Sequence, residues 1–167
     1  LELDITERKI AAVISITSPQ TQKTENWAIS DDGIWLMKIP DKNSAEAGSI
    51  SPQIYEDADK VLHITDVPYG AAPVVGTKCT DESILNALDI VSQLTTDLAN
   101  HVAGVSATDT ANTVLTLDNG VQIAFGTGEK VRDKERVCLA LMEEHPNSIA
   151  FINVRVVERP TWRALGS

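Results

Sequence analysis

A glycine-rich segment, Gly126-Thr127-Gly128-Glu129-Lys130, is the one stretch of this chain that could bind phosphate. Backbone amides at the start of a helix, together with a lysine, can hold such a group. The spacing differs from that of a P-loop, and Val131 stands where a Mg²⁺-binding hydroxyl is needed. The formal charge of −10 also disfavours anionic ligands. We therefore interpret the segment as an ordinary loop between a strand and a helix.

The histidines and cysteines show no spacing typical of a metal site. His63, His101 and His145 are isolated, and no second histidine lies four residues before His145. Cys79 and Cys138 form no CxxC pair, and a GxSxG nucleophile motif is absent. The abundant carboxylates are typical of a solvated surface. We therefore expect no catalytic residue, no metal site and no cofactor.

Length and composition fit one globular domain. The chain has 167 residues, of which 43% are apolar and 23% charged. Aromatic residues make up only 4%, so Val, Ile, Leu and Ala must supply most of the core. An excess of 24 acidic over 14 basic residues makes the chain a poor partner for nucleic-acid backbones and anionic lipid. No apolar run reaches the roughly 18 residues that a membrane span needs.

Strand signals dominate the first part of the chain. Residues 1–7 alternate apolar and polar side chains, and residues 13–16 are a β-branched run around Ser15, so residues 1–16 predict one long strand or two joined strands. Two apolar runs flank Ser30-Asp31-Asp32-Gly33, which predicts a hairpin. The polar residues 40–52 predict a surface loop, and residues 61–65 predict a short strand.

Two helices are expected in the second part. Residues 80–100 carry an apolar stripe at helical spacing, with Thr80 as the expected N-cap. Residues 129–144 predict the other helix, which Pro146 ends.

Further strands surround these helices. Residues 102–107 and 112–117 predict strands, and the second of them continues through Asn119-Gly120 into a hairpin. Residues 149–157 predict the last strand, and a tail with Pro160 and Trp162 follows it. Because hairpins imply antiparallel pairing, the sequence predicts an α+β fold: a mainly antiparallel sheet with two helices packed on it.

The last expected strand raises two alternatives. If it lies at a sheet edge, its unpaired backbone groups are open to a strand from another chain. If it lies inside the sheet, Trp162 packs on the body of the domain. The pattern alone leaves both alternatives open.

The order of the motifs resembles a known family. Residues 5–11 are similar to its VxERxPVA strand, with Ile10 in place of proline, and residues 27–33 are similar to its W-x-hydrophobic-x-D-x-x-G hairpin. Residues 115–126 match L-x-L-x-x-G followed by V-x-L-G, residues 134–141 a short helix, and residues 151–155 the final IDLR strand. In this order the chain resembles the extracytoplasmic β domain of the FtsQ/DivIB cell-division proteins. The family's LPxLxG motif falls at residues 62–70 or 73–76.

The resemblance implies a domain organisation and a location. Residues 1–10 correspond to the end of a POTRA-type domain or a linking strand, residues 11–159 to the β domain, and residues 160–167 to a C-terminal tail. Family members are single-pass proteins of the cell membrane, with this domain on the extracytoplasmic side and the membrane helix outside the present sequence. In that compartment Cys79 and Cys138 are as open to a disulfide as to two free thiols.

The resemblance also implies a function. Family members are non-enzymatic scaffolds of the divisome, which bind FtsB/DivIC-like and FtsL-like proteins during septum formation. The partner adds a strand at the last strand of the domain. Carried onto this sequence, the partner-binding residues are Ile152, Val154, Val156, Val157, Glu158, Arg159 and Trp162.

An alternative function depends on one mixed polar cluster. His63, Asp66 and Tyr69 follow one another around the end of an expected strand. A small-ligand site needs a pocket on which several polar groups converge. An extracytoplasmic small-ligand-binding domain or an unrecognised enzyme is therefore the alternative to the scaffold.

Overall fold

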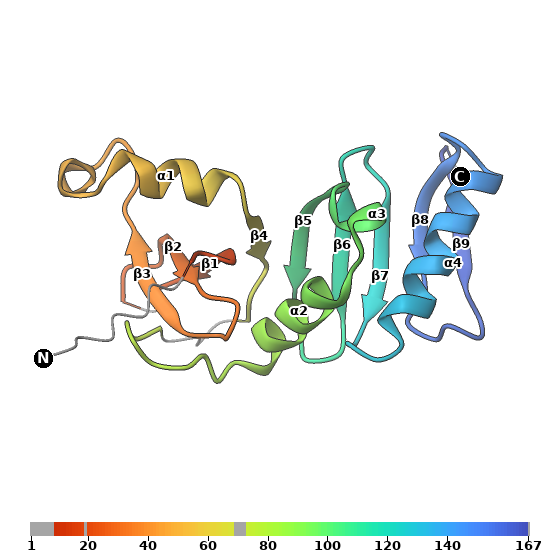
Figure 1. Cartoon of the computed structure of the whole chain (residues 1–167), viewed down its shortest axis with the longest axis horizontal. Coiled ribbons are helices and arrows are strands. Elements are labelled where there is room, and N and C mark those ends of the chain that lie inside the picture. Colours follow the sequence, from red (N-terminus) through yellow and green to blue (C-terminus); the bar gives the residue numbers. More distant parts are fainter. Residues whose placement is uncertain (1–8, 19, 69–72, 167) are drawn as a thin grey trace, which may run out of the picture.

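A single nine-stranded sheet organises the part of the chain that the computed structural model describes, residues 9–18, 20–68 and 73–166. The strand order is β3-β2-β1-β4-β5-β6-β7-β8-β9 (Figure 1). The strands are β1 (Ala12–Thr17), β2 (Thr24–Ile29), β3 (Trp35–Ile39), β4 (Leu62–Thr65), β5 (Val102–Ala107), β6 (Thr113–Leu117), β7 (Gln122–Gly126), β8 (Ile149–Asn153) and β9 (Thr161–Ala164). The helices are η1 (Ala45–Ser49), α1 (Pro52–Asp59), α2 (Glu82–Gln93), α3 (Thr96–Ala99) and α4 (Val131–Glu144).

The sheet is mixed, so the predicted fold class is wrong. Strands β1 and β4, β4 and β5, and β7 and β8 pair in parallel, and the described residues form four α-helices instead of two. The physical reason lies in the connections. Three segments cross over between strands: one carries α1, one carries α2 and α3, and one carries α4. Each returns the chain to the side of the sheet at which the preceding strand began, so the next strand runs in the same direction as that strand. Both predicted hairpins, β2–β3 and β6–β7, are confirmed.

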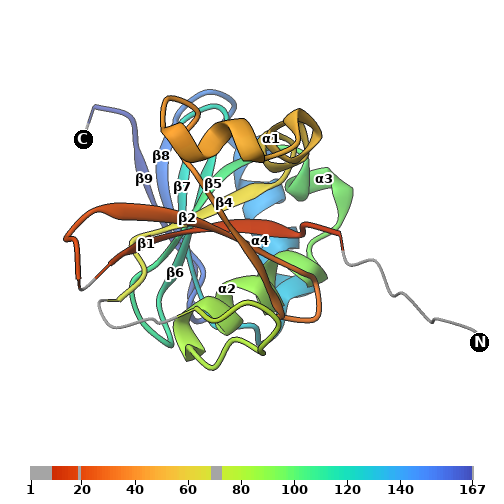
Figure 2. The same ribbon diagram turned by 90° about the vertical axis from the view of Figure 1, so that its left-hand side faces the viewer.

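Helices cover the sheet on both faces. Ala12, Ile14 and Ile16 of β1 belong to the large core cluster that also contains the buried side chains of α2 and α4. Val13, which alternates with them, belongs to a second cluster in which Ala58 of α1 is buried. Therefore α1 packs on the opposite face from α2 and α4. Figure 2 looks along the row of strands and shows the twist of the sheet from β1 to β9.

The expected helix over residues 80–100 is divided into α2 and α3. Asp81, and not Thr80, is the N-cap of α2, because its carboxylate accepts from the backbone amides of Ser83 and Ile84 at 2.9 and 3.2 Å. The buried carboxylate of Glu135 accepts from Thr95 N at 3.0 Å and from Thr95 Oγ1 at 2.7 Å. This contact binds the amide that would otherwise continue α2, so a new helix begins at Thr96.

A buried lysine holds α4 against the end of β7. Lys134 Nζ donates to the carbonyl oxygens of Phe125 and Thr127 at 2.9 and 3.1 Å. Burial lowers the pKa of Lys134 because the charged form loses its hydration. Thr127 belongs to the glycine-rich segment considered above as a phosphate loop, and Phe125 directly precedes that segment. In that segment an ideal Cβ on Gly128 would lie 2.0 Å from Asp89 Oδ2, so a carboxylate packs directly against the loop.

Other differences concern short elements. Helix α1 follows a segment expected as loop, and its N-terminus is capped by Ser51, whose Oγ accepts from Gln53 N at 3.3 Å. The last expected strand, residues 149–157, ends at Asn153, and β9 follows within the expected tail. The first part of the strand expected over residues 1–16, residues 1–8, lies outside the described residues, as do Pro19 and Tyr69. None of the described helices combines the length and apolar character that a membrane span requires.

Gly126 occupies a backbone conformation that other residues rarely adopt, with φ at +84°. A Cβ added there would lie 3.0 Å from Arg155 Cγ and 3.4 Å from Arg155 Cα. We expect Gly126→Ala to lower the free energy of unfolding by about 1–3 kcal/mol, measured by urea denaturation. Gly104→Ala is the matched control, because a Cβ on Gly104 of β5 meets nothing within 4 Å. Equal stability of the two variants would contradict the strain at Gly126.

Cys79 and Cys138 are free thiols, only 2% and 0% exposed. Burial raises the pKa of Cys79 and raises that of Cys138 to about 12, because a thiolate there would lack solvation. We expect a disulfide-exchange thiol reagent at pH 8 to label neither cysteine in the folded protein and both cysteines in denaturant without reductant. Absence of labelling in denaturant, followed by labelling after reduction, would instead reveal a disulfide.

Candidate partner-binding edge

Strand β9 forms one end of the sheet. It pairs antiparallel with β8 through Ile152↔Trp162 and Asn153↔Thr161, and in the described part of the chain no strand lies on its other side. Strand β8 is an interior strand between β7 and β9. The edge therefore belongs to β9, four residues of the expected tail, and not to residues 149–157. Because β9 is so short and follows Pro160, its pattern alone carries little strand signal.

The backbone of β9 has a defined inner and outer side. Leu165 N donates to Ser148 O at 2.8 Å, so the amide of Leu165 points toward the sheet. Along an extended strand the amide and carbonyl groups of successive residues point alternately to the two sides. This alternation directs the amide and carbonyl of Trp162 toward the outer side, where another strand could pair with them.

The opposite edge of the sheet is partly covered. Trp35 N of β3 donates to Thr77 O at 3.0 Å, and Gly76 N donates to Trp35 O at 2.8 Å. Ile34 forms an isolated antiparallel bridge with Lys78, and Pro40 follows the last residue of β3. The turn over residues 74–78 thus occupies the start of β3, whereas no strand lies beyond β9 in the described part of the sheet.

The predicted partner-binding residues divide into buried and exposed ones. Ile152 and Val154 are 0% exposed, and Val154 N donates to Ala124 O at 3.0 Å, so both belong to the core. Val157 is half-buried. Val156 is 55% exposed and Trp162 is 36% exposed. The exposed residues of the β8–β9 loop and of β9 are Arg155, Val156, Glu158, Arg159, Pro160, Thr161, Trp162 and Arg163.

Two ring contacts fix the faces of β9. The Trp162 ring stacks on His145, the C-cap residue of α4, with ring centroids 4.3 Å apart and an interplanar angle of 29°. The Arg163 guanidinium lies over the Phe151 ring on the other face, 4.7 Å from its centroid. Sequence reasoning named Trp162 but missed His145 and Arg163, since only the pairing of β8 with β9 and the return of α4 bring these side chains together.

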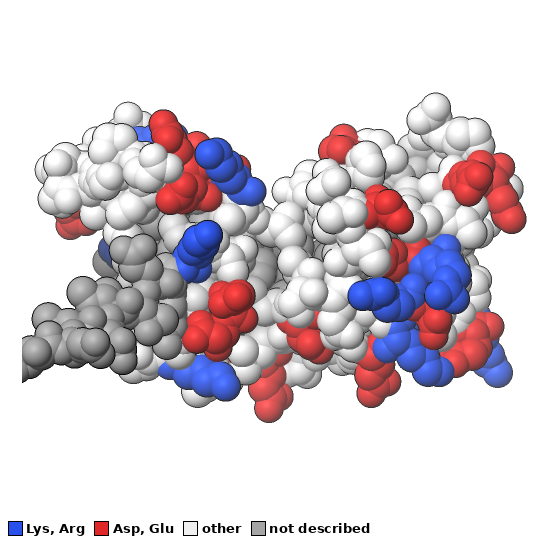
Figure 3. All heavy atoms as spheres, in the orientation of Figure 1, with Lys and Arg blue, Asp and Glu red and all other residues white. Residues whose placement is uncertain are grey.

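The charge near this edge differs from that of the rest of the chain. Residues 129–166 contain seven of the 14 basic residues and six of the 24 acidic residues. Basic side chains gather around the N-terminal half of α4, whereas acidic ones lie at its C-terminal end (Figure 3). Lys130 Nζ and Glu158 Oε1 are 2.5 Å apart, and this contact raises the pKa of Lys130 and lowers that of Glu158. Glu158 is therefore paired with Lys130, and Arg159 and Arg163 place further positive charge before and within β9.

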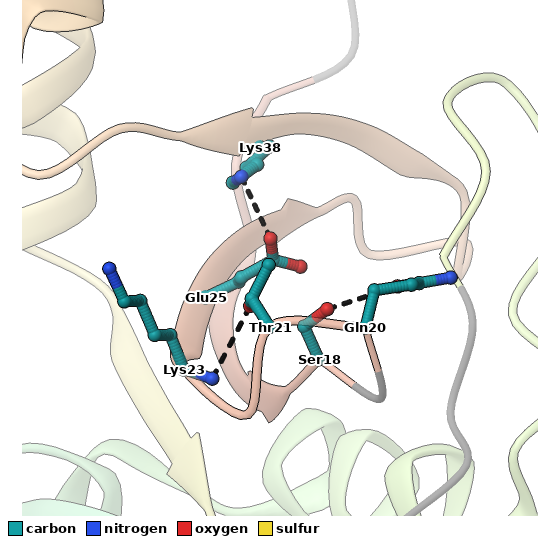
Figure 4. A network of polar contacts seen from close by, with 6 residues as sticks. All are labelled: Ser18, Gln20, Thr21, Lys23, Glu25 and Lys38. Carbon is teal, nitrogen blue, oxygen red and sulfur yellow. Dashed lines mark hydrogen bonds and ion pairs between the residues drawn. The ribbon is translucent and has the colours of Figure 1, made fainter.

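A cavity lies at the other end of the sheet, between α1 and the β1–β3 strands. It encloses about 700 Å³ and is lined by Glu25, Lys38, Tyr55 and His63 among others. Its polar groups bond to one another: Lys38 Nζ lies 2.8 Å from Glu25 Oε2, and Tyr55 Oη donates to Pro40 O at 2.7 Å. Figure 4 shows that the bonds around the β1–β2 turn, such as Lys23 N to Thr21 Oγ1, are likewise internal. The cavity is thus part of a paired network.

The alternative ligand cluster is not assembled in the described residues. His63 Nε2 lies 3.0 Å from Ala58 O of α1, whereas Asp66 accepts from Ser106 Oγ of β5 at 2.8 Å. Tyr69, its third member, lies outside the described residues. Within the described part of the chain, no group of three or more His, Cys, Asp or Glu side chains could hold a metal ion.

Comparison with known proteins identifies the family. The family model described as cell division protein FtsQ/DivIB, C-terminal, matches residues 19–155, from the turn after β1 to two residues beyond β8. A search of curated proteins found no match. The matched residues cover most of the sheet and the four α-helices, and the predicted resemblance is confirmed. The chain belongs to the family of C-terminal domains of the FtsQ/DivIB cell-division proteins.

Proposed function

We propose that this chain is a non-enzymatic divisome scaffold domain that binds FtsB/DivIC-like and FtsL-like proteins by strand addition at β9 during septum formation. The observation that carries the proposal is the position of β9 at the open end of the sheet. The membership in a cell-division family supplies the process in which such a partner acts. Strand addition needs an unpaired backbone and tolerates variation in side chains.

The side chains around β9 support protein binding. Val156, Trp162 and Leu165 are three exposed large apolar residues within ten positions of one another. Exposed aromatic and arginine side chains are enriched at protein interfaces, and Trp162 and Arg163 are neighbours here. The proposed contact consists of the outward backbone groups of Trp162 with the side chains of Val156, Arg159, Trp162 and Arg163. Ile152 and Val154 act by holding β8 in place beneath it.

The proposed location follows from the same family membership. The full-length protein is anchored in the cell membrane by a single helix outside this sequence, with residues 11–159 as its β domain on the extracytoplasmic side. Residues 1–10 belong to a POTRA-type domain or to the strand that links it to the β domain. Catalysis has no part in the proposal, because scaffold binding needs only the edge and its neighbours.

Backbone pairing at Trp162 can be separated from the contact of its ring. Trp162→Ala and Trp162→Pro both remove the ring, but only proline also removes the outward amide and blocks a neighbouring strand. We expect Trp162→Pro to bind the extracytoplasmic part of its FtsB/DivIC-like partner at least about tenfold more weakly than Trp162→Ala, measured by calorimetric titration.

The stability of both variants serves as the control. Because the Trp162 amide faces away from β8, both variants should unfold at similar urea concentrations. Equal partner affinity of the two folded variants would exclude backbone pairing at Trp162 and would leave side-chain contact alone.

A further inference from the structure

The exposed side of α4 carries opposite charges at its two ends (Figure 3). Arg132 and Arg136 lie in its N-terminal half, and Glu143 and Glu144 lie in its last turn. Ala140, which is also exposed, separates the two pairs. Because residues three or four positions apart are neighbours on a helix, these five side chains share one side of α4, opposite its buried side.

The acidic pair lies at the end of α4 where the helix dipole disfavours it. The C-terminal end of a helix carries partial negative charge, so basic side chains stabilise it and acidic ones destabilise it. The last turn of α4 contains Glu143 and Glu144 and no basic residue. Glu144 is 70% exposed, and its Oε2 lies 4.0 Å from His145 Nε2. A charge arrangement that lowers the stability of a helix is expected where a contact outside the chain offsets it, and for two glutamates that contact is positively charged.

The two arginines differ in how firmly they are held. Arg132 donates from Nε to Gln93 O at 3.3 Å, which ties it to the last residue of α2. Arg136 is 78% exposed on its side chain, and its Nη1 lies 3.6 Å from Asp133 Oδ1. Such a surface pair has a small energy, so Arg136 can turn toward a new acidic partner.

A second copy of α4 carries the matching charges in the required order. Arg136 and Glu144 each lie four residues from Ala140. When two such helices run antiparallel across a twofold axis at Ala140, Arg136 of each copy therefore faces the partner's Glu144. The ion pair then forms twice, and Glu143 adds to the negative charge beside it. The small Ala140 side chain permits close approach of the two helix axes, to about 8 Å.

We propose that two copies of this chain associate through α4 in this antiparallel, twofold arrangement. Local opposite charge gives the contact its specificity, because each copy has a formal net charge of −10 and two copies otherwise repel each other. A contact that uses the same surface on both copies closes at two. The exposed side of α4 faces away from the sheet, whereas the outward backbone groups of Trp162 lie along the plane of the sheet, so the dimer leaves β9 open.

Charge reversal tests the reciprocal pairing by sedimentation equilibrium of the 167-residue chain. Because α4 has 14 residues and spans about 21 Å, the contact is smaller than a standard interface, and we expect a dissociation constant of about 10⁻⁴ M. Arg136→Glu and Glu144→Arg should each weaken association at least about tenfold, because each brings like charges together twice. The double variant Arg136→Glu/Glu144→Arg restores opposite charges and should associate like the wild type.

Control variants separate the pairing from other effects of charge. Glu56→Lys, a reversal at an exposed position of α1, should not change association. Glu144→Arg should unfold at the same or a higher urea concentration than the wild type at about 1 μM, where monomers prevail, because a basic residue suits this end of the helix. A lower urea midpoint would contradict the argument from the dipole. Trp162→Pro should dimerise like the wild type, which distinguishes this contact from strand addition at β9.

Three results would overturn the dimer. The first is a wild-type chain that stays monomeric at about 1 mM, and the second is a double variant that associates as weakly as the single variants. The third is equal weakening by Glu56→Lys, which would show a general effect of charge. Loss of association in Trp162→Pro with wild-type association of Arg136→Glu would place the contact at β9 and contradict pairing through α4. The proposed strand addition stands or falls separately, on the partner affinity of the Trp162 variants.

Discussion

The crossover through α4 is the constraint on which the open edge depends. It returns the chain from β7 to β8 in parallel, so a further strand can pair only on the outer side of β8. Two adjacent buried residues of α4 fix this crossover: Lys134 binds the carbonyls at the end of β7, and Glu135 binds the start of α3. Such buried groups require their partners, because an unpaired buried charge costs several kcal/mol. The position of β9 therefore depends on bonds made in the first half of α4.

Local signals in the sequence predicted the elements better than their arrangement. The hairpin around Asn119-Gly120 and the helix over residues 129–144 have strong short-range signals, and the structure contains both. The mixed sheet could not be read in this way, because parallel pairing depends on where α2 and α4 return the chain. The division between α2 and α3 depends on Glu135, which lies 40 residues beyond Thr95. No sequence pattern near Thr95 predicts its contact with Glu135.

Local signals are also insufficient to locate the edge strand. The sequence places Trp162 in the tail and predicts the apolar run at residues 149–157 as the last strand. In the structure the strand in that run ends at Asn153. The next residue, Val154, is buried and its amide donates to Ala124 O, and the residues after it form a loop. Thr161–Ala164 then pairs with β8 over a length too short for a reliable periodic signal. The resemblance to the FtsQ/DivIB proteins points to the C-terminal end of the domain, and in the structure the edge strand at that end is Thr161–Ala164.

The unequal edges of the sheet bear on stoichiometry. A sheet with two open edge strands can add copies of a chain in succession, which is the geometry of fibrous assemblies. In this domain the turn over residues 74–78 occupies the start of β3, and a register shift between Ala28 and Ile29 disturbs the β2–β3 ladder beside it. The strand addition proposed at β9 therefore has no equally open counterpart at the start of β3, which favours discrete one-to-one complexes over polymers.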